Sequence, residues 1–81
     1  MDDNELRYIR EHGIKPEDEA AFRRMDKYYY FLDAFMWCED NGYGCDYDLA
    51  VEMSEYVEDK YDSNMTHWDN FEAAYNACRE V

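Results

Sequence analysis

The 81-residue sequence is poor in positive charge and in residues that break secondary structure. It has 8 Lys and Arg against 21 Asp and Glu, and the resulting formal net charge of −13 disfavours direct binding to nucleic acid or to an anionic membrane. A single Pro and three Gly leave long segments without a strong breaker. No apolar run approaches the roughly 18 residues that a membrane-spanning helix needs.

Disulfide pairing and a targeting signal are also not indicated. Three Cys is an odd number, whereas small secreted domains usually carry an even set, so we expect reduced thiols. The start, Met-Asp-Asp-Asn-Glu, lacks the basic and apolar regions of a signal peptide. Both features predict a cytoplasmic protein.

What the sequence does contain is apolar and aromatic material. Hydrophobic residues make up 47% of the chain and aromatic residues 19%, which favours a folded domain over a disordered acidic segment. The length suits one domain, so residues 1–81 are predicted to form a single acidic helical domain.

Apolar spacings of three and four residues predict an all-α fold, a compact bundle of three to four short helices. Pro16 suits the first position of a helix, and Gly13 and Gly42 suit the residue after one. Asp46 and Thr66 are candidate N-caps. The expected helices cover about residues 3–12, 16–40, 46–62 and 66–78. For the second helix the predicted core face is Phe22, Met25, Tyr29, Leu32 and Met36.

Negative charge is concentrated in the second half of the chain, where residues 39–72 hold 11 acids and one base, Lys60. At about 100° per residue, five acids of the third helix fall within an arc of roughly 80°. This acidic stripe consists of Asp48, Glu52, Glu55, Asp59 and Asp62. Tyr56 lies at its edge and Glu58 beside it, and these seven residues are the predicted partner contacts.

A row of acids on a helix is often no more than a solvated face. Here, however, like charges at i,i+4 destabilise the helix by about 0.2–0.5 kcal/mol per pair, and no alternating Lys offsets that cost. Tyr56 is of a type enriched at interfaces. Successive carboxylates rise by roughly 5 Å along the axis, on the scale of phosphate spacing in a nucleic-acid strand. The pattern therefore favours an interaction face for a basic protein.

Enzymatic and metal-binding functions find less support, and we expect neither catalysis nor a cofactor. His12 and His67 fall at predicted helix ends, where surface or capping roles are common. Cys38 and Cys45 lack the spacing of a zinc site. Residues 40–51 resemble a calcium loop only superficially, because Gly42, Gly44 and Val51 occupy positions that need oxygen ligands.

The size, the excess of Asp and Glu interleaved with Tyr, and the helical pattern resemble the small acidic counter-defence proteins of phages and mobile elements, such as Ocr, ArdA and several anti-CRISPR proteins. The segment Trp68-Asp69-Asn70-Phe71-Glu72-Ala73-Ala74-Tyr75 is similar to a stretch of ArdA proteins and covers eight residues of the 81.

The resemblance implies a stoichiometric inhibitor that acts in the cytoplasm of a bacterial host cell. As an acidic DNA mimic, it would occupy the basic nucleic-acid-binding site of a restriction enzyme or a CRISPR effector. The alternative is an acidic adaptor or regulatory protein that binds a basic host protein without mimicking DNA.

Overall fold

The computed structural model describes residues 3–22 and 26–79, and these form an all-α bundle of short helices, as predicted. Four helices have nine or more residues: α1 (Asp3–Glu11), α3 (Asp26–Asp40), α4 (Tyr47–Lys60) and α5 (His67–Cys78). A 3₁₀ turn, η1 (Pro16–Asp18), and the four-residue α2 (Glu19–Phe22) follow α1. No strand occurs within the described ranges.

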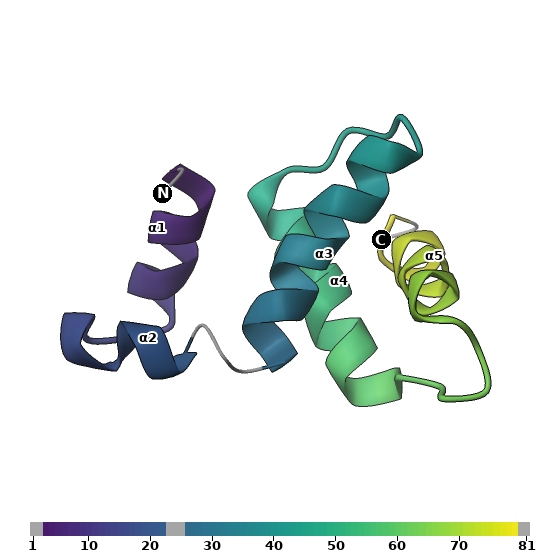
Figure 1. The fold of residues 1–81 in the computed structure, drawn as a ribbon. Helices are drawn as coiled ribbons and strands as arrows, with labels where there is room; N and C mark the ends of the chain where they lie inside the picture. The colour runs from purple at the N-terminus through teal and green to yellow at the C-terminus, as the bar shows by residue number, and fades with distance from the viewer. Residues whose placement is uncertain (1–2, 23–25, 80–81) are drawn as a thin grey trace.

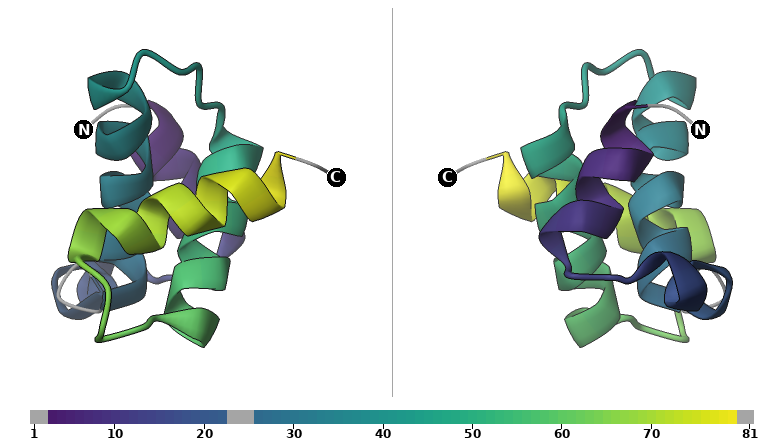
Figure 2. Two further views of the ribbon diagram at one scale, coloured as in Figure 1. Left: turned by 90° about the vertical axis from the view of Figure 1, so that its right-hand side faces the viewer. Right: turned by 90° about the vertical axis from the view of Figure 1, so that its left-hand side faces the viewer.

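The antiparallel pair α3 and α4 forms the centre of the bundle (Figure 1). Helices α1 and α2 lie on one side of this pair and α5 lies on the other. The side views show α5 crossing one face of the pair while α1 covers the opposite face (Figure 2). The acidic helix α4 packs mainly against α3 and α5, and its residues 52, 55, 58 and 59 are exposed.

The predicted helix ends are confirmed where local capping signals mark them. Gly13 and Gly42 adopt positive φ values of 67° and 74°, a conformation that favours glycine after a helix. The Asp46 side chain accepts a hydrogen bond from the Leu49 N–H at 2.8 Å, and Thr66 Oγ1 accepts one from the Asp69 N–H at 3.1 Å. Asp46 thus orients the first turn of α4.

The prediction of one helix over residues 16–40 is wrong, because α2 and α3 run in different directions (Figures 1 and 2). Residues 23–25 lie outside the described part of the chain. Helix α3 packs against α4 and α5, whereas the main contact of α2 is with η1. The two helices are therefore held by different parts of the bundle.

The predicted core face of this segment is also wrong. Tyr29 and Met36 are about half exposed, at 51% and 50%, and Leu32 is only partly buried. The side chain of Phe22 and all of Met25 lie outside the described residues. The buried face of α3 is rotated by about one position and consists of Tyr28, Phe31, Ala34, Trp37 and Cys38. Since α3 is apolar on nearly every side, periodicity alone could not select the face.

Aromatic side chains fill the centre of the bundle. Tyr8 of α1 is fully buried and stacks on Phe31 at 4.2 Å between ring centroids, and Tyr47 meets both rings edge-on. Burial, followed by the charge of Glu58, raises the pKa of Tyr8 to about 12. The phenol therefore stays neutral at physiological pH and anchors α1 to the α3–α4 pair.

Candidate partner-binding site

Most of the predicted contact residues of α4 are exposed to solvent. The four acids Glu52, Glu55, Glu58 and Asp59 are exposed on the helix, and Tyr56 is partly buried beside them. Within residues 3–22 and 26–79, no Lys or Arg forms an ion pair with these four carboxylates. The stripe therefore keeps its negative charge along the middle of α4.

The first member of the stripe, Asp48, is partly neutralised. Its Oδ1 lies 3.6 Å from a guanidinium nitrogen of Arg7, whose Nε is 3.0 Å from Glu11 Oε1. The Arg7 guanidinium also lies 4.1 Å from the centroid of the Tyr47 ring, and the Tyr47 hydroxyl donates to Glu11 at 3.0 Å. Asp48 thus belongs partly to the contact between α1 and α4.

Asp62 lies beyond the end of α4 at Lys60, so the helical periodicity that placed it on the stripe does not apply. Its carboxylate accepts a hydrogen bond from the Asn64 N–H at 2.9 Å, and its backbone is held by Asn70. Asp62 is exposed and shapes the turn between α4 and α5. Its role as a partner contact stays a prediction.

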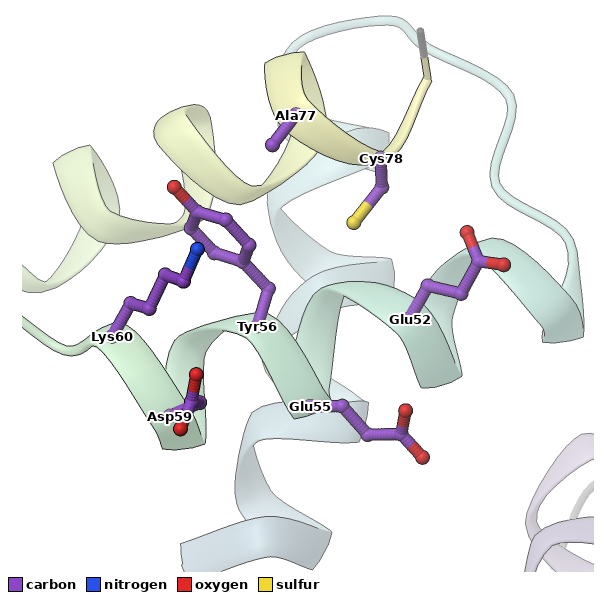
Figure 3. A pocket seen from close by; sticks show the side chains of 7 residues that line it. All are labelled: Glu52, Glu55, Tyr56, Asp59, Lys60, Ala77 and Cys78. Carbon is purple, nitrogen blue, oxygen red and sulfur yellow. The ribbon is translucent and has the colours of Figure 1, made fainter. Parts of the chain in front are cut away.

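The structure brings four of the seven predicted contacts together at one groove between α4 and the end of α5 (Figure 3). The groove has a volume of about 510 Å³ and is open to solvent. Its lining consists of Glu52, Glu55, Tyr56, Asp59, Lys60, Ala77 and Cys78. Carboxylates thus border a partly apolar and aromatic recess. A solvated helix face without a neighbouring helix would not form such a recess.

The electrostatic field of the groove acts on Cys78. Burial, followed by the negative charges of Glu52 and Glu55, raises the pKa of the Cys78 thiol. The thiol stays protonated near neutral pH, so its nucleophilicity is low. Figure 3 shows its sulfur pointing from α5 toward α4. Cys78 therefore contributes apolar surface to the lining of the groove.

Sequence reasoning missed three residues that line the groove. Ala77 and Cys78 come from α5, 15 and 16 residues beyond Asp62 at the end of the stripe, and no pattern in either helix indicates where α5 crosses α4. Lys60 was noticed only as an isolated base. A cation one turn after Tyr56 on a helix was the available signal, because residues at i and i+4 lie on one face.

A second cluster that sequence reasoning missed surrounds His67, the first residue of α5. Its Nε2 lies 2.9 Å from Asp33 Oδ2, so this nitrogen carries the proton that is donated to the carboxylate. The Tyr61 hydroxyl lies 3.2 Å from His67 Nδ1 and donates to it when the imidazole is neutral. Tyr30 stacks on Tyr61 with 6.0 Å between ring centroids.

This network joins α3, the turn after α4 and the start of α5. Asp33 and His67 are 34 residues apart in the chain, so the contact is purely tertiary. Trp68 is 41% exposed and meets the imidazole edge-on. The network fixes the beginning of α5, and the α5 axis then carries Ala77 and Cys78 to the groove.

Neither a metal site nor a membrane span emerges from the described ranges. They contain no group of three or more His, Cys, Asp or Glu placed to hold a metal ion. None of their helices is both long and apolar enough to cross a bilayer. Cys38, Cys45 and Cys78 are free thiols.

Comparison with known proteins adds no relative. The sequence matches no protein-family model, and neither a curated protein nor a solved structure shows significant similarity to it. The charge, shape and composition of the α4 surface are therefore the features that bear on function.

Proposed function

We propose that this protein is a stoichiometric inhibitor of a nucleic-acid-binding defence nuclease, of the anti-CRISPR or antirestriction type. It acts as an acidic DNA mimic that occupies the basic nucleic-acid-binding site of its target. The observation that carries the proposal is the row of exposed carboxylates on α4, from Glu52 to Asp59, without an ion pair among the described residues.

The chemistry of such a target complements this row. Nucleic-acid channels are lined with Lys and Arg, which bind phosphates through charge-assisted hydrogen bonds. Carboxylates at Glu52, Glu55 and Asp59 rise by about 4.5 and 6 Å along the helix axis and offer the same acceptor chemistry. The net charge of −13 also steers a basic partner toward the protein over long range.

Both candidate functions, the DNA-mimic inhibitor and the acidic adaptor, require a basic partner protein. The composition of the groove favours considering the adaptor as well. Tyr56, Ala77 and Cys78 form an apolar recess next to the carboxylates, a feature that a phosphate backbone does not have. This recess favours an acidic adaptor that recognises side chains of a basic host protein. Competition with DNA separates the two functions, because only a mimic of DNA must exclude it.

The first prediction compares two triple variants with equal change in net charge. Glu52→Lys/Glu55→Lys/Asp59→Lys places ammonium groups against the basic surface of the partner, where like charges cost several kcal/mol. We expect affinity to fall by roughly a hundred-fold to a thousand-fold. The control, Asp3→Lys/Glu17→Lys/Asp18→Lys, changes exposed acids of α1 and η1 on the other side of the bundle and should mainly slow association.

The measurement is binding to a purified Cas9-type effector and to a purified restriction enzyme, each with and without its cognate DNA. Circular dichroism first verifies that both variants remain helical. A DNA mimic gives binding that cognate DNA abolishes and that the α4 variant loses selectively. Binding that persists beside DNA selects the adaptor, and equal losses in the two triple variants reduce the stripe to bulk charge.

A further inference from the structure

The groove between α4 and α5 contains a cation that belongs to the chain itself. Lys60 Nζ lies 5.1 Å from the centroid of the Tyr56 ring, and both side chains line the groove (Figure 3). An ammonium within about 6 Å of an aromatic centroid is attracted by the negative face of the ring. Tyr56 is thus already a binding position for a cation.

Lys60 interacts with an aromatic ring although acidic residues lie next to it in the chain. Two acids, Glu58 and Asp59, directly precede it in the chain, yet Lys60 forms no ion pair within the described ranges. Its interaction is instead with the ring of Tyr56, one turn earlier on α4. The only Lys or Arg among residues 39–72 therefore lies against the aromatic ring of the groove lining.

The groove is also equipped for a larger cation than an ammonium. Glu52 and Asp59 lie one turn before and one turn after Tyr56 on α4, and both line the groove. A guanidinium is planar, stacks on aromatic faces and binds carboxylates in a bidentate manner, whereas an ammonium is a compact, strongly hydrated charge. The volume of about 510 Å³ accommodates a whole arginine side chain.

We propose that an arginine side chain of the basic partner binds in this groove and stacks on the Tyr56 ring. In the free protein Lys60 occupies this arginine site, and it leaves the site when the partner binds. The inference rests on the proposed function only in that the partner is basic, and it names the side chain that the partner supplies. Lys60 then acts as an internal competitor, which favours a partner with a well-placed arginine over general positive charge.

The probe that tests this proposal is the peptide acetyl-Gly-Arg-Gly-amide, with acetyl-Gly-Lys-Gly-amide as its counterpart. Each is titrated into the full chain while nuclear magnetic resonance follows the Tyr56 ring and the Ala77 methyl group. We expect the arginine peptide to shift both signals and to bind more tightly than the lysine peptide. Tyr56→Leu keeps an apolar side chain without the ring, and it should remove the preference for arginine.

The variant that isolates the internal competitor is Lys60→Gln. Its matched control is Lys15→Gln, which removes one positive charge from an exposed position before η1, away from the groove. Both variants change the net charge by the same amount, so long-range attraction is equal. Releasing a surface cation–π contact should tighten arginine binding by about two- to five-fold in Lys60→Gln, with a clearly smaller gain in Lys15→Gln.

Three results would overturn the proposal: equal gains in the two Gln variants, equal affinity for the lysine peptide, or shifts confined to residues outside the groove. None of them would disprove the proposed function, because a basic partner can still bind the exposed stripe. Conversely, the α4 triple variant could keep its affinity for nucleases while the arginine peptide binds the parent protein at Tyr56. That result would contradict the proposed function and support the arginine site.

Discussion

At the scale of single residues, burial on α3 decides which side chains carry the stability. Phe31 is fully buried against Tyr8 and Phe35, whereas its neighbour Tyr29 is 51% exposed. Residue type alone cannot distinguish the two, because both are large aromatic residues with similar secondary-structure propensities. Only the contacts from α1 and α4 assign the inner position to Phe31.

We therefore expect Phe31→Ala and Tyr29→Ala to differ sharply. A buried Phe→Ala change costs about 3–5 kcal/mol, comparable with the whole stability available to a domain of this size. Phe31→Ala should be largely unfolded at 25 °C, and Tyr29→Ala should stay within about 0.5 kcal/mol of the parent. Urea titrations followed by far-ultraviolet circular dichroism measure both, and the opposite order would mean that α3 packs through another face.

At the scale of elements, the turn between α4 and α5 is organised by a buried amide. Asn70 is 5% exposed, and its Oδ1 accepts a hydrogen bond from the Asp62 N–H at 2.8 Å. Its Nδ2 donates to the carbonyl oxygens of Asp62 at 3.1 Å and Thr66 at 2.9 Å. One side chain thus ties the turn to the first part of α5, and α5 supplies one wall of the groove.

Replacing this amide should cost more than removing the N-cap next to it. Asn70→Ala strands backbone groups of Asp62 at about 1–3 kcal/mol for each group that stays buried and unsatisfied. Thr66→Ala removes one capping bond, worth about 1 kcal/mol. Chemical unfolding of the two variants provides the comparison. A smaller loss for Asn70→Ala would show that solvent satisfies the turn and that Asn70 does not hold it.

At the scale of the whole molecule, repulsion between like charges opposes the compact state. The net charge is −13, and within the described residues the ion pairs made by Lys or Arg are those of Arg7 with Glu11 and Asp48. These exposed pairs contribute little. The fold is therefore held by its aromatic core against an uncompensated acidic surface.

Added salt should for this reason stabilise the protein. The Debye length shrinks from about 10 Å at 0.1 M to about 3 Å at 1 M, which screens repulsion along α4. We expect the thermal midpoint to rise as sodium chloride is added, in a scan by circular dichroism or calorimetry. A midpoint that falls with salt would mean that attraction between opposite charges outweighs repulsion.

Much of the fold follows from signals that act between near neighbours. The starts of α4 and α5 depend on Asp46 and Thr66, whose side chains bond N–H groups three residues away, so a sequence pattern is enough to predict them. Glycine after α1 and after α3 is equally local. The acidity and the exposure of the α4 carboxylates follow from composition and helical period, since charged side chains stay in water.

Contacts between distant residues decided the rest. The buried face of α3 was set by Tyr8 and Tyr47, which pack on Phe31 from two other helices. The groove exists because α5 crosses α4 beside Tyr56, a crossing that Asp33 and His67 help to fix across 34 residues of chain. Local pattern predicts the form and the charge of each helix, but the face it buries depends on what the other helices bring to it, and that is a property of packing.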